Sequence, residues 1–101
     1  MPTSKIIHTV AFTLRHKAGS TEEQRFLTDA RSILTTIPTV QNFEVLRQVG
    51  AKSPFHFGFS MEFADHSAYA IYNEHPHHVR FVGERWQTEV INFIELDYQV
   101  I

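Results

Sequence analysis

The sequence has 101 residues, which predicts a single domain over residues 1–101. Apolar residues make up 43% and charged residues 20%, as in ordinary globular proteins, so the composition argues against disorder. A net charge of −2 without a basic stripe argues against a nucleic-acid partner, and the absence of cysteine excludes disulfides and thiolate chemistry. No apolar run has the length of a bilayer span or the form of a signal-peptide core, so we expect a cytoplasmic protein with no membrane partner.

The chain begins with the pattern of a strand followed by a helix. Ile6–Arg15 alternates between two faces, which predicts a strand. Ser20 and Glu23 have the spacing of a capping box, and apolar residues at helical spacing follow them. The pair Ile37-Pro38 is predicted to end that helix. One face of the strand is formed by His8, Val10, Phe12 and Leu14.

Two further strands are predicted before the next helix. Val40–Val49 is the less regular of the two, and its β-branched residues favour a strand. Gly50–Pro54 reads as a loop. Phe55–Phe63 alternates strictly, so we expect a strand whose apolar face carries Phe55, Phe57, Phe59, Met61 and Phe63.

A broken helix and a last strand complete the chain. Asp65 is a candidate N-cap for a helix over Asp65–Asn73. Pro76 breaks this helix, because the residue before a proline avoids helical angles, whereas proline itself suits the first position of a new helix. The second helix is predicted to carry Val79, Val82 and Trp86 on one side, and Val90–Val100 is predicted as the last strand.

The element order β-α-β-β-α-β predicts an α+β fold of the ferredoxin-like type, with a four-stranded antiparallel sheet and the helices on one face. The other face of the sheet would be left open, and half of it would be apolar. A second copy of the same sheet is the simplest cover, so we expect a homodimer that forms an α+β barrel. The residues expected on the open face are Ile7, Ala11, Ile91 and Phe93, mixed with Thr, Gly and Ser.

Three of the seven histidines lie around Pro76. His75 is expected to cap the second helix through a ring nitrogen, and His77 is expected on its solvent face. His78 and Tyr72 are a candidate pair for acid–base chemistry, with the imidazole as base and the phenol as donor. The alternative is structural: His78 could cap backbone groups freed by the break, with Tyr72 packed over it.

Metal binding is the other chemistry that a histidine cluster can indicate. His75 and His78 are spaced i, i+3, and Glu74 and His78 are spaced i, i+4, and both spacings can chelate from an unbroken helix. The break at Pro76 spoils this geometry, and the sequence offers no clear third ligand. We therefore expect no metal and no cofactor.

An ordered set of motifs gives the chain a family resemblance. These are His8–Leu14, Ile37–Val40, Phe57–Phe63, the Tyr-x-x-His-Pro-x-His pattern of Tyr72–His78, and Leu96-Asp97-Tyr98. Together they resemble the stress-responsive A/B barrel (Dabb) family, within the dimeric α+β barrel superfamily. This resemblance implies a dimeric barrel, in agreement with the fold predicted from the element order.

More distantly, the chain is similar to a plant polyketide cyclase of that family, olivetolic acid cyclase, which catalyses a cofactor-free aldol closure. The resemblance implies that Tyr72 and His78 correspond to its acid–base pair and His8 to a pocket histidine. A further pocket histidine of that enzyme falls at Phe57 here, so a more apolar pocket is expected. The residues expected to line it are Val10, Phe12, Phe57, Phe59, Met61 and Phe81.

The sequence thus predicts a dimeric protein with a small apolar pocket for an apolar or aromatic ligand. If it is an enzyme, cofactor-free acid–base chemistry on a small carbonyl or aromatic compound is expected, with His78, Tyr72 and His8 as catalytic residues. A non-catalytic stress or assembly protein is the alternative, and a cofactor-free monooxygenase is a third. Asp97 and Tyr98 are expected to anchor the sheet edge or the dimer contact.

Overall fold

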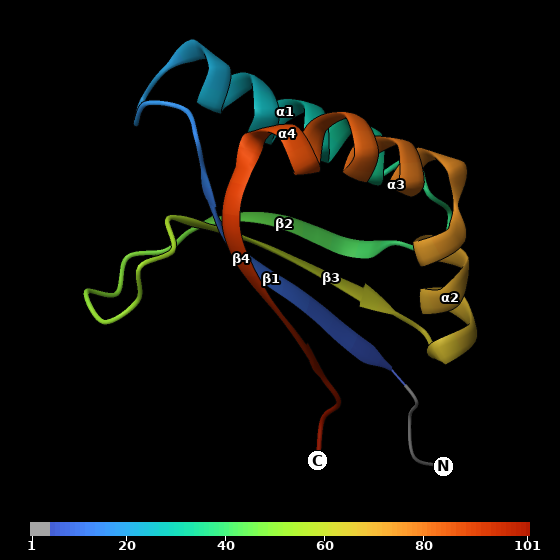
Figure 1. Ribbon diagram of the computed structural model, residues 1–101. Coiled ribbons are helices and arrows are strands. Elements are labelled where there is room, and N and C mark those ends of the chain that lie inside the picture. The colour runs from blue at the N-terminus through green and yellow to red at the C-terminus, as the bar shows by residue number, and fades with distance from the viewer. Residues whose placement is uncertain (1–4) are drawn as a thin grey trace.

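Helices cover one face of a four-stranded sheet in the computed structural model, which describes residues 5–101 (Figure 1). The strand order is β2-β3-β1-β4, and all neighbouring strands are antiparallel, which confirms the predicted ferredoxin-like α+β fold. None of the helices within residues 5–101 has the length and apolar character needed to cross a bilayer. The elements are β1 Ile6–Leu14, α1 Thr21–Leu34, β2 Gln41–Arg47, β3 Phe57–Phe63, α2 His66–Glu74, α3 Pro76–Phe81, the π-helical turn η1 Val82–Trp86, α4 Gln87–Glu89 and β4 Val90–Tyr98.

An aromatic core joins the sheet to the helices. The alternation of β1 and β3 directs their larger apolar side chains toward the helices, as predicted. Phe12 is fully buried, and its ring lies 4.6 Å from that of Phe59, 5.9 Å from that of Phe26 in α1 and 5.0 Å from that of Trp86. Ring pairs at these separations stabilise beyond the area that they bury.

Helix α1 ends earlier than predicted. The amide of Thr35 still bonds to the helical carbonyl of Arg31, but the amide of Thr36 bonds to that of Ile33, which tightens the last turn. Pro38 excludes the preceding residue from helical angles, so Ile37 lies in the turn after Leu34 and is nevertheless buried.

The middle strands are shorter than predicted. Val49, the last residue of the predicted strand, lies beyond the end of β2 at Arg47 and is 88% exposed. Phe55 lies before β3, because its carbonyl accepts a hydrogen bond from the side chain of Gln48 and its amide donates to Ser53. These side chains take the place of ladder bonds.

The segment after Pro76 is not one regular helix. Residues 82–86 form a π-helical turn between α3 and α4, which the sequence did not indicate. Phe81 is buried, whereas Val79 is 57% exposed, so the prediction that Val79 shares the inward side with Val82 was wrong. Position 81, two residues further on, points inward instead.

The register of β4 corrects one predicted face. Phe93 lies opposite Phe12 and therefore faces the helices, where its ring is 5.5 Å from that of Trp86. The prediction that Phe93 lies on the open face was wrong, because alternation along β4 does not itself say which parity points inward. Ile91 is exposed beside the irregularity at Thr13/Leu14.

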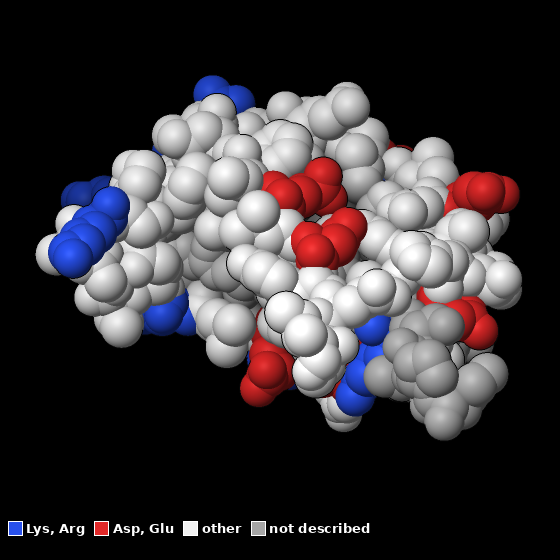
Figure 2. Space-filling view, turned by 90° about the horizontal axis from the view of Figure 1, so that it is seen from below, with Lys and Arg blue, Asp and Glu red and all other residues white. Residues whose placement is uncertain are grey.

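The open face of the sheet carries apolar side chains from β1 and β4. Ile94, Leu96 and Tyr98 of β4 share this face with Ile7 and Ala11 of β1, and each of the three is 45–50% exposed. Figure 2 looks onto the underside of the molecule and shows mostly uncharged surface with separated acidic side chains and no continuous basic area.

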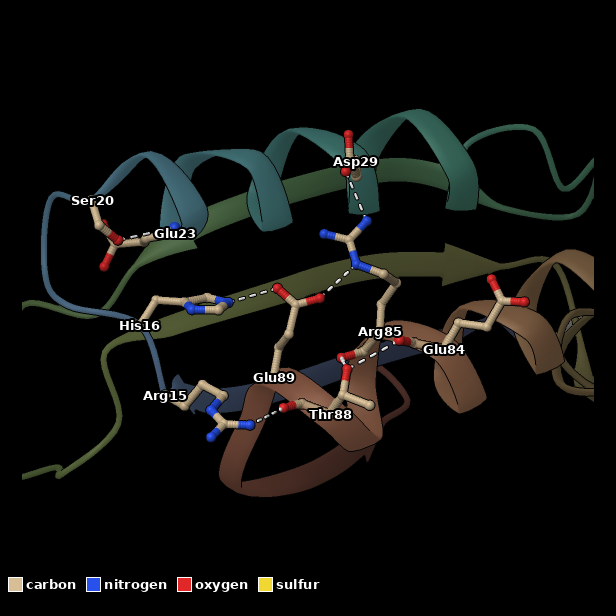
Figure 3. Close-up of polar contacts among 9 residues, drawn as sticks. All are labelled: Arg15, His16, Ser20, Glu23, Asp29, Glu84, Arg85, Thr88 and Glu89. Atoms are coloured by element: carbon tan, nitrogen blue, oxygen red, sulfur yellow. Dashed lines mark hydrogen bonds and ion pairs between the residues drawn. The ribbon is translucent and has the colours of Figure 1, made fainter.

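A polar cluster ties the π-helical turn to α1 and to the end of β1 (Figure 3). Nη1 of Arg85 lies 2.7 Å from a carboxylate oxygen of Asp29, and its Nε lies 2.5 Å from Glu89. Nε2 of His16 lies 2.6 Å from the other oxygen of Glu89. Burial raises the pKa of the Glu89 carboxyl, but hydrogen bonds from Arg85 and His16 outweigh it and lower that pKa overall.

The substitution Glu89→Gln is expected to lower the free energy of unfolding at neutral pH by about 2 kcal/mol, because it removes charge-assisted hydrogen bonds from a half-buried site. A carboxyl with a lowered folded pKa stabilises above its unfolded pKa and loses that effect as the pH falls through the folded value. Urea denaturation should therefore show a difference in the free energy of unfolding between the parent protein and Glu89→Gln, and this difference should disappear well below pH 4.5.

The matched control is Glu84→Gln, which removes an ion pair with Arg80 whose two side chains are 61% and 77% exposed. Such a pair contributes little to stability. An equal loss in both variants, or a gap for Glu89→Gln that does not depend on pH, would contradict the assignment.

Candidate functional site

The break at Pro76 determines where the His78 side chain lies. Residue His75 is extended and caps α3. In an unbroken helix the Asn73 carbonyl would accept the amide of His77, but this amide donates to Nδ1 of His75 at 3.1 Å, which confirms the predicted cap. The Asn73 carbonyl instead accepts a hydrogen bond from Nδ1 of His78 at 3.0 Å.

This hydrogen bond sets the chemistry of the His78 ring. A neutral imidazole that donates through Nδ1 carries its lone pair on Nε2. No described residue hydrogen-bonds to that Nε2. Burial is the main cause that lowers the pKa of His78. The ring is therefore a neutral proton acceptor near physiological pH, while it also caps the broken helix.

Tyr72 lies directly against this imidazole. The two ring centroids are 4.3 Å apart, and Tyr72 is only 3% exposed. Burial raises the pKa of Tyr72, and the negative charge of Glu95 adds to the effect, so the phenol keeps its proton. No described residue hydrogen-bonds to its hydroxyl, so the O–H is available as a donor.

The third predicted residue, His8, is held by a carboxylate from the neighbouring strand. His8 pairs with Asp97 in the β1–β4 register, and Nδ1 of His8 lies 2.5 Å from Oδ1 of Asp97. The hydroxyl of Tyr69 donates to the other oxygen of Asp97 at 2.9 Å and lies 3.0 Å from Nδ1 of His8. With Nδ1 engaged, Nε2 of His8 is left for other partners, and it is 3.8 Å from a carboxylate oxygen of Glu95.

Sequence reasoning missed Asp97 and Tyr69 as partners of His8. Asp97 was assigned only to the sheet edge or the dimer contact, although it belongs to the inward parity of β4. Tyr69 precedes Tyr72 by three residues, a spacing that places both on one side of a helix. The parity of Asp97 and the spacing of Tyr69 and Tyr72, taken together, would have indicated that Asp97 and Tyr69 lie near His8.

A cavity of about 380 Å³ brings the three predicted catalytic residues to one place. His8, Tyr72 and His78 all contribute to its wall. Four of the residues predicted to line a pocket also do so, namely Val10, Phe59, Met61 and Phe81. The volume lies in the range of small-molecule sites.

Phe12 and Phe57 do not line this cavity. They pair with each other across β1 and β3, four residues along β1 from His8. A strand advances by about 3.3 Å per residue, so this pair lies too far along the sheet. Both side chains pack in the core, where Phe57 lies under the guanidinium group of Arg47.

The π-helical turn forms the wall opposite the sheet. Val82 and Trp86 line the cavity from this turn, Gln87 lines it from the start of α4, and Phe93 and Glu95 line it from β4. π-Turns within helices are frequent at functional sites. This wall could not be anticipated from the sequence, because the departure from regular helical spacing has no recognised sequence signal.

The polar part of the cavity wall combines the imidazoles of His8 and His78 with the hydroxyl of Tyr72. No lysine or arginine belongs to the described lining. No three or more histidine or acidic side chains of the described residues are grouped so as to hold a metal ion. The arrangement can accept a proton at His78 while Tyr72 donates to an oxygen nearby.

Comparison with solved structures supports the fold. A Dabb family protein with a ferredoxin-like fold from Mesorhizobium loti is 56% identical, with a TM-score of 0.95, over 96% of this chain and 97% of that one. A dimeric protein of unknown function from Bacteroides fragilis is 20% identical, with a TM-score of 0.73, over 99% and 100% of the two chains. A hydroxynitrile lyase from Passiflora edulis is 12% identical, with a TM-score of 0.85, over 99% and 96%.

None of the curated proteins matches the sequence significantly. The sequence model of the stress responsive A/B barrel domain matches residues 6–100, which is nearly the whole chain. The paired helices over an antiparallel sheet, the close likeness to a Dabb protein and this match agree with one another. The chain therefore belongs to the stress responsive A/B barrel domain (Dabb) family.

Proposed function

We propose that the cavity binds a small carbonyl or aromatic compound and catalyses cofactor-free proton transfer on it. The observation that carries this proposal is the state of His78, whose Nδ1 is engaged by Asn73 while Nε2 is left unpartnered beside the protonated Tyr72. A base and a donor this close suit the removal of a proton next to a carbonyl group.

In the proposed step, the carbonyl oxygen of the substrate accepts the hydrogen bond of the Tyr72 hydroxyl. Nε2 of His78 takes a proton from the adjacent carbon, and the electrons of that C–H bond form the enolate, whose charge lies on the oxygen held by Tyr72. His78 then returns the proton to carbon. In an aldol closure the enolate instead attacks a second carbonyl carbon, and the alkoxide that forms takes the proton from His78. His8, oriented by Asp97, is a second acceptor at the same end of the cavity.

The hydroxynitrile lyase among the structural neighbours fits the same type of chemistry. Cleavage of a hydroxynitrile removes the hydroxyl proton while the C–CN bond breaks, which gives the carbonyl compound, and the departing cyanide takes up a proton. This reaction therefore also needs a base and a proton donor. The alternative remains a non-catalytic protein in which His78 only caps the Asn73 carbonyl. The experiment below distinguishes the two.

Deuterium exchange of the α-protons of phenylacetone in D₂O, followed by NMR, measures the proposed proton transfer without knowledge of the natural substrate. The variant His78→Ala is expected to lose at least about a hundredfold of the catalysed exchange, since general-base catalysis contributes about that much or more. Tyr72→Phe should lose a comparable factor. The melting temperature of His78→Ala should fall by only about 4 °C, which corresponds to one lost hydrogen bond.

His77→Ala is the matched control, because His77 neighbours His78 but contacts Thr36, in the turn after α1, and does not line the cavity. Its exchange rate should equal that of the unaltered protein. Exchange no faster than in buffer, or equal exchange in all variants, would favour the non-catalytic alternative.

The pH dependence of this exchange offers a separate prediction. Burial lowers the pKa of His78 from the ordinary value of 6.5, so the ring stays neutral and active at pH values where an exposed histidine is protonated. As the pH is lowered, the second-order rate constant for exchange should therefore fall to half of its maximum at a pH below 6.5. If exchange depends on His78 but its rate constant falls to half at pH 6.5 or above, the claim that a buried, neutral His78 is the base is contradicted.

We also propose that two copies of the chain pair through the open sheet face. The support is the half-exposed apolar row of Ile94, Leu96 and Tyr98, joined by Leu46 of β2, which is 44% exposed. The structural neighbour from Bacteroides fragilis is described as dimeric. Burying such a face against its own copy is the usual solution for a self-complementary surface.

The substitution Leu96→Arg is expected to convert the dimer to a monomer, because it introduces a charge at the centre of the proposed apolar contact. Sedimentation velocity would measure this change. Val79→Arg is the control, since Val79 is as exposed but lies in the helical layer, and it should remain dimeric. A monomeric parent protein, or a dimer that Leu96→Arg leaves intact, would refute the proposed interface.

A further inference from the structure

We propose that Glu95 determines specificity by excluding anionic ligands, so that the cavity accepts uncharged carbonyl or aromatic compounds and rejects their carboxylate analogues. This inference rests on the proposed function, because it concerns the ligand of the same cavity. It adds a selection rule that the acid–base pair alone does not provide.

The first support is the distribution of charge around the cavity. Glu95 contributes the one carboxylate of the described lining, and no guanidinium or ammonium group in that lining offsets it. Its side chain is 57% exposed, which places the charge where the cavity meets solvent. A ligand bound against His8 and Tyr72 would lie close to this group.

The second support is that the negative charge is not neutralised by its neighbours. Among the described residues Glu95 has no ion pair with a lysine or arginine, and its one charged contact is Nε2 of His8 at 3.8 Å. His8 is already hydrogen-bonded to one oxygen of Asp97, and the hydroxyl of Tyr69 is hydrogen-bonded to the other. Two carboxyl groups, those of Asp97 and Glu95, thus face the single imidazole of His8.

The third support is that the charge acts on the residues that would meet a ligand. Burial is the main reason why the pKa of Tyr72 is raised, and the charge of Glu95 contributes to the same increase. A ligand carboxylate at the Tyr72 hydroxyl would feel the same repulsion. An uncharged carbonyl oxygen would accept the Tyr72 hydrogen bond without it.

The remainder of the wall suits the body of such a ligand. Phe59, Trp86 and Phe93 provide aromatic surface for an apolar group. The cavity therefore combines apolar walls, the donor hydroxyl of Tyr72 and the carboxylate of Glu95. This combination selects on charge between molecules of equal size and shape.

Phenylacetone and phenylacetate form a matched pair of probes, because they differ chiefly in the replacement of a methyl group by a charged oxygen. Dissociation constants for both, measured by ligand-observed NMR at neutral pH, should show the ketone binding at least about tenfold more tightly, a difference of about 1.4 kcal/mol. In Glu95→Gln the ratio should fall toward one, chiefly through tighter binding of phenylacetate.

The control is Glu22→Gln, which changes the net charge of the protein equally but lies at the exposed start of α1. It should keep the ratio of the parent protein. A ketone that binds with a ratio unchanged by Glu95→Gln, or a parent protein that binds phenylacetate as tightly, overturns the charge selection alone. Failure of both probes to bind any of the proteins overturns the proposed ligand site and the selection with it.

Discussion

The hydrogen bond from His78 to the Asn73 carbonyl is the contact on which the candidate site depends. Proline supplies no amide to the preceding helix, and the His77 amide is taken by His75, so the Asn73 carbonyl would otherwise lose its partner. One imidazole nitrogen satisfies this carbonyl and thereby fixes the other as an acceptor. The structural and the chemical interpretations of His78 are therefore not exclusive, because the cap is what orients the base.

The cavity wall around this contact is stabilised from the helical layer and from the sheet. Arg85, between Asp29 and Glu89, ties the π-helical turn to α1, and the neighbouring Trp86 reaches the cavity. On the sheet side, the pairing of His8 with Asp97 aligns β1 with β4. Ionic contacts thus hold the helical wall of the cavity, and the strand register holds its sheet wall.

The sequence was most informative where a pattern is local. Alternation in β1 and β3, the capping residue Ser20 and the break at Pro76 follow from contacts within a few residues, and the fold follows from their order. Phe93 was placed on the wrong face because the inward parity of β4 depends on its register with β1, which is a long-range property. Asp97 and Glu95 approach His8 through that register, and Tyr69 approaches it from α2. The π-helical turn that places Trp86 has no sequence signature. Phe12 and Phe57 have the right parity for the cavity but lie too far along the strands, a distance that parity does not encode.

The position of β4 at the edge of the sheet has a thermodynamic consequence. Its odd residues Phe93 and Glu95 border the cavity, and its even residues Ile94 and Leu96 belong to the open face. A subunit contact through Ile94 and Leu96 would restrain β4, and the opposite face of the same strand lines the cavity. Ligand affinity and self-association would then be linked functions, each strengthened by the other, and the measured affinity would depend on protein concentration.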